Sequence, residues 1–197
     1  MENHVEQSCP ICGVENSLKM LAHTSEIPYF GEHTQITMSC DSCGWRVTDF
    51  IPAEGKKAGS WKLVVSSADH VNARVVRSSS CTVRVEELGL EVTPGSSSTG
   101  YISNVEGVLD RFSSAIGTIR RQADAEGDED ILEKCDELLS KIDMVMNSHL
   151  TVTLELLDPV GHSQILHDEA VSSEISDDDA KELDPGPVYP IFDVSSE

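Results

Sequence analysis

The sequence predicts an α+β protein: a four-cysteine zinc ribbon followed by a β-rich domain that carries an inserted antiparallel helical hairpin, with a disordered acidic tail. Three observations support this fold class. Residues 1–51 hold two C-x-x-C pairs, residues 61–167 alternate short valine-rich runs with two long amphipathic stretches, and residues 168–197 are rich in acids. The segment "PAEGKKAGS" (52–60) has the composition of a flexible linker between the first two regions.

The two cysteine pairs, "CPICG" and "CDSCG", predict a metal site. A spacing of two residues lets both sulfurs of a pair face one point, and the following glycine allows the tight turn that this requires. Four such sulfurs, from Cys9, Cys12, Cys40 and Cys43, are the tetrahedral set that a structural zinc ion prefers. A redox pair or disulfides are the alternatives, although a redox C-x-x-C is typically single and disulfides are rare in cytosolic proteins. His33 lies between the pairs and could replace one cysteine.

The ribbon also contains an aromatic run, "EIPYFGE". Pro28 and Gly31 predict a turn that projects Tyr29 and Phe30. Together with Trp45, which follows the second cysteine pair, they are candidates for binding a partner protein. The alternative is that these aromatic side chains pack around the zinc site, because a small ribbon has few other groups for a core.

The region after the linker is expected to be mostly strands. Its valine-rich runs are bounded by Ser, Asn or Gly, as is typical of short strands. Downstream, "LTVTLELLD" and "HSQIL" flank the turn sequence "DPVG", which predicts a β-hairpin. The four earlier strands are predicted at Trp61–Val65, Val71–Val76, Cys81–Val85 and Leu88–Val92.

A helical hairpin is predicted at about residues 103–149. Ser103 and Glu106 have the spacing of a capping box at the start of the first helix. The acidic segment "EGDED" interrupts the apolar pattern and supplies negative charge for the start of the second helix. The first apolar face consists of Val105, Val108, Leu109, Phe112, Ile116 and Ile119. The second consists of Ile131, Leu132, Cys135, Leu138, Leu139, Ile142, Val145 and Met146.

The acidic tail and the net charge limit the possible partners. The chain has 35 acidic and 14 basic residues, a formal net charge of −21, and residues 168–197 contain too few apolar groups to offset the entropy of ordering. Such a charge repels phosphate backbones, so the sequence argues against nucleic acid as a partner. No apolar window approaches the roughly 20 residues of a membrane span, and the N-terminus is polar, so a soluble, cytoplasmic protein is expected.

The loop from Thr93 to Gly100 follows a strand-like run and precedes a helix, which is the layout of phosphate-binding loops. It lacks the Gly-Lys-Ser/Thr ending of a Walker loop, and the nearest basic residue downstream is Arg111. No serine, cysteine or histidine has the partners that nucleophilic catalysis requires. The sequence therefore predicts a connecting loop, no catalytic residues, no enzyme activity and no small-molecule substrate.

Several motifs, in order along the chain, resemble those of the ZPR-type zinc-finger family. They are "CPICG", "IPYFGE", "CDSCGWR", "ARVVRSSSCTVRVEELGLEVTPGS", "NVEG" and "LLDPVGHS", over roughly Cys9 to Leu166. The resemblance implies one structural zinc ion on the four cysteines, and a four-cysteine finger joined to a β-rich domain with a helical hairpin. Eukaryotic members repeat this module in tandem, so one copy looks like the archaeal form. The chain departs from the family at Thr93, at Ser103-Asn104 and at His162.

By this resemblance the chain is expected to be a zinc-binding protein-interaction module that binds translation elongation factor 1-alpha and assists its folding or maturation. The alternative is a nucleic-acid-binding zinc ribbon of the translation or transcription machinery. Between Cys9 and Phe50, however, the cationic side chains are Lys19 and Arg46 alone, which form no basic stripe. A nucleotide-processing enzyme that uses the loop after Val92 is a third hypothesis.

Overall fold

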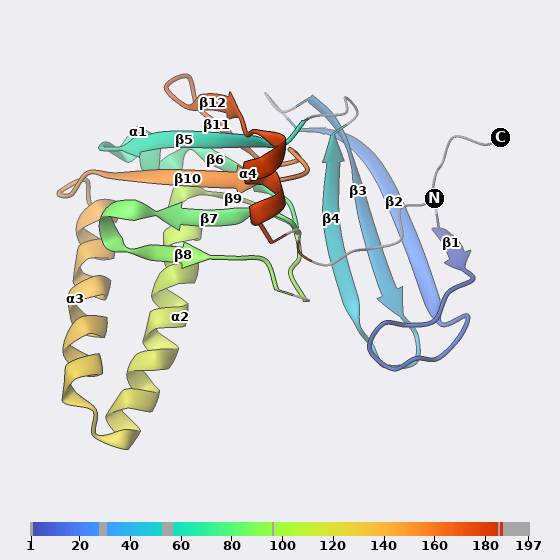
Figure 1. Ribbon diagram of the computed structural model, residues 1–197, viewed down its shortest axis with the longest axis horizontal. Coiled ribbons are helices and arrows are strands. Elements are labelled where there is room, and N and C mark those ends of the chain that lie inside the picture. Colours follow the sequence, from blue (N-terminus) through green and yellow to red (C-terminus); the bar gives the residue numbers. More distant parts are fainter. Residues whose placement is uncertain (1, 28–30, 53–56, 96, 185, 187–197) are drawn as a thin grey trace.

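The computed structural model describes residues 2–27, 31–52, 57–95, 97–184 and 186. The N-terminal strands form one sheet of four strands. Figure 1 shows a second β-rich body beside this sheet, with the long helices α2 and α3 projecting from it. The fold class predicted from the sequence is confirmed. No described helix is long and apolar enough to cross a membrane.

The N-terminal sheet, which we call the ribbon sheet, is an antiparallel meander in the order β1-β2-β3-β4. Its core consists of side chains at the cysteine end, including Leu18, Met38 and Val47, each at most 5% exposed. The strands are β1 (Glu2–Val5), β2 (Leu18–Ile27), β3 (Gly31–Cys40) and β4 (Arg46–Pro52).

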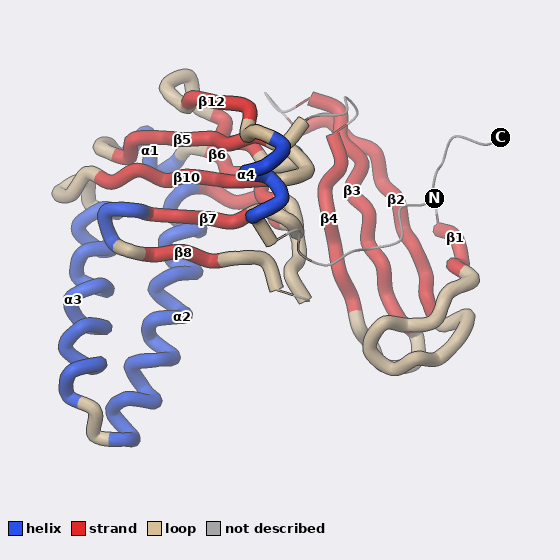
Figure 2. The backbone as a smooth tube through the Cα atoms, viewed as in Figure 1, coloured by secondary structure: helices blue, strands red, loops and turns tan. Residues whose placement is uncertain are grey.

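The second body is built from two sheets, as the tube view in Figure 2 shows. One sheet has the order β12-β5-β10-β7-β8 and the other β11-β6-β9. One large cluster of buried apolar side chains draws residues from both sheets and from the helices. The strands are β5 (Gly59–Val65), β6 (Arg74–Arg77), β7 (Thr82–Val85), β8 (Leu90–Val92), β9 (Tyr101–Asn104), β10 (Val152–Asp158), β11 (Gln164–Leu166) and β12 (Val171–Glu174). The helices are α1 (Ala68–Asn72), the 3-10 turn η1 (Glu86–Leu88), α2 (Val105–Glu126), α3 (Glu129–Met146) and α4 (Asp177–Glu182).

The helical hairpin of α2 and α3 confirms the prediction, with one shift at its start. Asn104, not Ser103, caps α2, because the Asn104 side chain accepts a hydrogen bond from the Gly107 N–H at 2.8 Å. Asp128 caps α3 in the same way, accepting from the Ile131 N–H. Gly127 ends α2 with φ of 73°, a conformation that favours glycine.

The outer half of this hairpin is less buried than the apolar pattern predicts. Phe112 and Ile142 near its base are 5% and 0% exposed, whereas Ile119 is 53% and Ile131 39% exposed. The hairpin extends beyond the sheets (Figure 1), so its outer turns pack mainly on each other and leave part of each apolar stripe uncovered.

The β-hairpin predicted around "DPVG" is wrong. β10 lies between β5 and β7, whereas β11 pairs with β6 in the other sheet. The turn therefore carries the chain from one sheet to the other. The strand predicted at Val71–Val76 starts only at Arg74, because Ser67 caps the short helix α1 by accepting from the His70 N–H.

The acidic segment that begins at Asp168 is ordered over more of its length than its composition predicts. β12 pairs with β5 at the edge of the larger sheet, and the Ser60 and Ser173 hydroxyls are 2.7 Å apart. Ser176 then caps α4. An exposed sheet edge supplies backbone partners, so this strand does not need to bury apolar side chains. Residues 185 and 187–197 lie outside the described residues.

A three-serine loop, Ser78–Ser80, joins the parts of the protein. Asp158 at the end of β10 is 1% exposed and accepts the Ser78, Ser80 and Ser163 hydroxyls at 2.6–2.8 Å. Burial alone would raise the pKa of Asp158, but these three hydrogen bonds and one from the Val160 N–H outweigh it and leave the pKa below its usual value.

Ser79, the middle residue of the same loop, attaches the ribbon sheet to the second body. Ser79 donates its N–H and its hydroxyl to the two carboxylate oxygens of Asp49 on β4, at 2.9 and 2.5 Å. Beside it, the Thr99 hydroxyl and the Gly100 N–H both donate to the Thr48 carbonyl, at 2.9 and 2.7 Å. The β4 strand is therefore attached to the second body at consecutive residues.

Candidate metal centre

Two tight turns bring the four cysteines together. Cys9 and Cys12 lie between β1 and β2, and Cys40 and Cys43 lie at the turn between β3 and β4. In each turn a glycine four residues after the first cysteine closes the loop: the Gly13 N–H donates to the Cys9 carbonyl at 2.9 Å, and the Gly44 N–H to the Cys40 carbonyl at 3.0 Å. The Gly13 φ of 70° is in the left-handed region, which explains the glycine in the motif.

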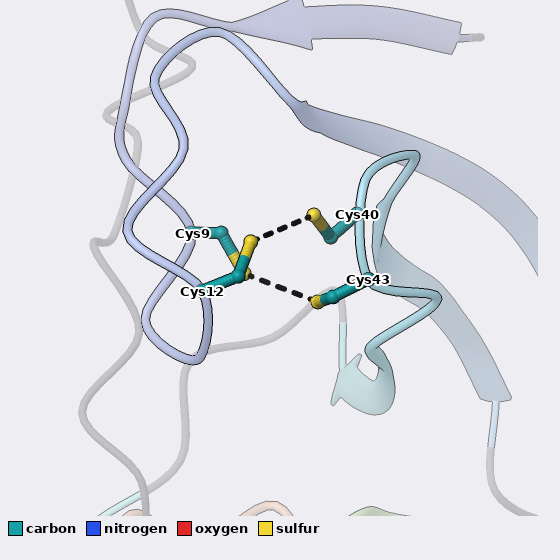
Figure 3. A group of neighbouring side chains, drawn as sticks. All are labelled: Cys9, Cys12, Cys40 and Cys43. Carbon is teal, nitrogen blue, oxygen red and sulfur yellow. Dashed lines mark hydrogen bonds between the residues drawn. The ribbon is translucent and has the colours of Figure 1, made fainter.

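The four sulfur atoms have the separation of a tetrahedral zinc site. All four lie within 4.8 Å of one another, with Cys9 Sγ 3.8 Å from Cys43 Sγ and Cys12 Sγ 3.7 Å from Cys40 Sγ (Figure 3). Zinc–sulfur bonds of about 2.3 Å in a tetrahedron place the sulfurs roughly 3.8 Å apart. A disulfide requires about 2.05 Å, and all four cysteines are free thiols. The site thus fits one zinc ion.

The thiols differ in how readily they lose their protons. A hydrogen bond with the Ser17 hydroxyl, 3.3 Å away, lowers the pKa of Cys40 to about 6. At Cys43 the Trp45 N–H favours the thiolate, but burial and the three neighbouring thiols together raise the pKa to about 12. Four thiolates at this spacing repel one another, so a bound dication is what stabilises the fully ionised set.

The site is closed, as expected for a structural metal. Four cysteines complete a tetrahedron and leave no coordination position for a substrate. Among the described residues no other group of histidines, cysteines and acids has this geometry. His33 is not part of it: the imidazole is buried on β3, near the Ser25 hydroxyl (3.3 Å) and the Phe50 ring. The alternative ligand considered from the sequence is therefore wrong.

Of the three aromatic residues predicted to bind a partner, the structure describes Trp45. Trp45 is partly buried and packs against the ribbon core beside the zinc site. This is the packing role that the sequence left open for it. Tyr29 and Phe30 lie outside the described residues, so their partner-binding role stays a prediction.

The loop between β8 and β9 has the role of a junction. Its polar groups bind protein groups: Arg77 donates to the Ser98 hydroxyl at 3.1 Å and to the Thr99 carbonyl at 3.2 Å. Arg77 is itself 6% exposed and also donates to the Cys81 carbonyl. Sequence reasoning missed this arginine, Asp49 and Asp158; the run "RSSSC" and the distant "LLDP" were its signals, but their pairing depends on contacts far apart in the sequence.

Both parts of the chain match models of known protein families. A family model described as the ZPR1 zinc-finger domain matches residues 3–56, and one described as the ZPR1 jelly-roll domain matches residues 69–182. The chain belongs to the ZPR1 family. The resemblance inferred from the motifs is confirmed, and each of the two models matches this ZPR1-family chain once.

Archaeal relatives match the ZPR1-family chain over most of its length. An uncharacterized ZPR1-like protein of Methanocaldococcus jannaschii is 35% identical over 94% of this chain and 92% of its own length. A similar protein of Pyrococcus horikoshii is 34% identical over 91% of this chain and 80% of its own. The zinc finger chaperone zpr1 of Schizosaccharomyces pombe is 25% identical over 82% of this chain, which spans 34% of that longer protein.

Proposed function

We propose that this ZPR1-family chain is a zinc-dependent, cytoplasmic protein-interaction module that binds translation elongation factor 1-alpha and assists its folding or maturation. The motif resemblance supports the partner, and the name of the fission-yeast relative, a chaperone, supports the type of activity. The observation that carries the proposal is the surface charge of the ribbon sheet, which has the cysteine site at one end and is attached to the second body through Asp49 on β4.

That surface is acidic. Of its two described cations, Lys19 is paired with Asp41 at 2.8 Å, which leaves Arg46. A surface of this kind suits a basic or apolar region of a protein and not a phosphate backbone. The described acids of residues 2–52 with placed side chains are Glu6, Glu15, Glu26, Glu32, Asp41 and Asp49.

A capture experiment tests this proposal. The zinc-loaded chain is immobilised and mixed with purified elongation factor 1-alpha. A variant with Cys40→Ser and Cys43→Ser serves as the zinc-free form, and Ser42→Ala, at an exposed position between them, is the matched control. Retention by the wild type and by Ser42→Ala but not by the double variant is expected; equal retention by all three would remove the zinc ribbon from recognition.

The aromatic run gives a second test of the same interaction. If Tyr29 and Phe30 are anchors, each substitution by alanine weakens binding by more than about 1 kcal/mol. Unchanged affinity in both variants would remove them from the proposed contact.

A nucleic-acid-binding ribbon is the alternative function. Its distinguishing assay is filter binding at low salt, where phosphate contacts are strongest. We expect no retention of RNA or DNA. We also propose that the chain is not an enzyme, because the β8–β9 loop binds its own arginine and backbone; incubation of the pure protein with GTP or ATP should give no turnover.

A further inference from the structure

The outer edge of β2 extends beyond its neighbour. β2 pairs with β3 along all ten residues, from Leu18 to Ile27, but with β1 only from Leu18 to Leu21. No other described strand lies on that side of the sheet. From His23 onward, alternate backbone N–H and C=O groups of β2 therefore point away from the sheet and meet no partner strand within the described part of the chain. In Figure 1 this edge lies on the side away from the larger body.

From His23 to Glu26 the described edge has no lysine, proline or β-bulge, three of the features that block strand addition. Proteins protect exposed edges with lysines, prolines or β-bulges, or cover them. The register of these residues with β3 is one-to-one. An unbroken, extended edge of this kind is a template for an added strand.

The charges at the end of this edge specify what could add to it. Glu26 and Glu32 are directly opposite each other in the β2–β3 register, and both are exposed. Like charges in such a pair are destabilising. Among the described residues neither carboxylate has an ion pair, and Lys19 at the far end of β2 is paired with Asp41. A cationic side chain placed beside the two glutamates would relieve this repulsion.

We propose that the edge of β2 from His23 to Ile27 binds an extended, lysine- or arginine-bearing segment of a partner protein, which adds to the ribbon sheet as a fifth strand. Backbone hydrogen bonds supply affinity, and Glu26 and Glu32 select cationic segments. A second copy of this chain is a poorer occupant, because its own strand would bring further carboxylates and a net charge of −21 to the same edge. The inference deepens the proposed function and rests on it for the identity of the partner.

Backbone hydrogen exchange of the full, zinc-loaded chain tests the inference. The first probe is an eight-residue peptide of alternating lysine and valine, with a glutamate–valine peptide as its matched control. The second probe is purified elongation factor 1-alpha. We expect exchange at alternate amides between His23 and Ile27 to slow at least about tenfold with the cationic peptide and with the factor, and not with the acidic peptide. The amides of β10, paired on both sides, serve as the unchanged reference.

Substitution of the two glutamates gives a quantitative test of the charge preference. Glu26→Gln and Glu32→Gln should each weaken binding of the cationic peptide about two- to fivefold, the range of an exposed ion pair. Glu133→Gln, at an exposed position on α3, should leave the affinity unchanged.

The outcomes separate this inference from the proposed function. If the factor binds without protecting these amides, the edge is not its site, although the proposed function stands. If the factor does not bind but the cationic peptide protects the amides, the edge inference stands and the proposed function fails. Unprotected amides with both probes would overturn the inference.

Discussion

Replacement of Asp158 by asparagine should destabilise the fold. Asp158 Oδ1 accepts from Ser80 Oγ and the Val160 N–H, and Oδ2 accepts from Ser78 Oγ and Ser163 Oγ. The Val160 N–H can only donate, so the amide oxygen must take the place of Oδ1. The new NH₂ group then faces the other two hydroxyls, which must turn and accept.

The magnitude follows from the loss of charge assistance. A hydrogen bond to a charged group is worth about 1.5–3 kcal/mol and a neutral one about 0.5–1.5 kcal/mol. All four bonds lose this charge assistance, whereas a neutral amide costs less to bury than a carboxylate. We therefore expect a net fall of about 2–3 kcal/mol in the free energy of unfolding. For a chain of this size the melting temperature should drop by roughly 5–10 °C.

The stability difference between wild type and Asp158→Asn should depend on pH. Because the pKa of Asp158 is lowered in the folded state, its contribution is fully present above the ordinary carboxyl pKa of about 3.9 and is lost as the pH falls through the lowered value. Urea unfolding of wild type and Asp158→Asn should therefore converge at low pH. Asp168→Asn, at an exposed acid, is the control. Equal stability of Asp158→Asn and wild type at pH 7 would refute the assigned role of the serine loop.

Three further outcomes are expected. Zinc affinity should fall at least about tenfold per pH unit on acidification, because Cys43, with a pKa of about 12, must release its proton when zinc binds. Competition with a chromophoric chelator measures this affinity, and an affinity that does not change with pH would contradict the prediction. Gly100→Ala should cost about 1–3 kcal/mol in urea unfolding, since its Cβ would lie 2.7 Å from Asp49 Oδ1, whereas Gly95→Ala, with open space around it, should be neutral. Phe112→Ala should cost about 3–5 kcal/mol in the same assay, and a loss below 1 kcal/mol would show that the hairpin base is not core.

The sequence was most informative where structure is local. The zinc ligands follow from two short motifs, because a spacing of two residues and a glycine determine the turn without help from distant parts of the chain. The helical hairpin was equally accessible, since its apolar faces repeat along the sequence. The shift of the α2 cap from Ser103 to Asn104 shows the limit of such rules: both residues can cap a helix, and both lie at the end of β9, so residue type alone does not predict which one caps it.

The order of the strands in the two larger-body sheets could not be predicted from the sequence in the same way. β10 has the alternation of an ordinary strand, yet its neighbours, β5 and β7, both precede the helical hairpin. β12 similarly depends on β5, far upstream, and nothing in its own exposed, polar residues indicates a strand. The contacts of Asp49 and Asp158 with the serine loop also join residues far apart in the sequence, on β4 and at the end of β10.

The position of β10 has a consequence for how the chain acquires its fold. During synthesis the zinc ribbon, which pairs only strands within residues 2–52, can close as soon as it emerges and captures its metal. The larger sheet cannot, because its central strand is made after both helices of the hairpin. Until residue 158 is available, β5 and β7 lack the strand that lies between them. Such non-local pairing slows folding, so the nascent protein should pass through a stage with a finished ribbon beside an incomplete, aggregation-prone larger sheet.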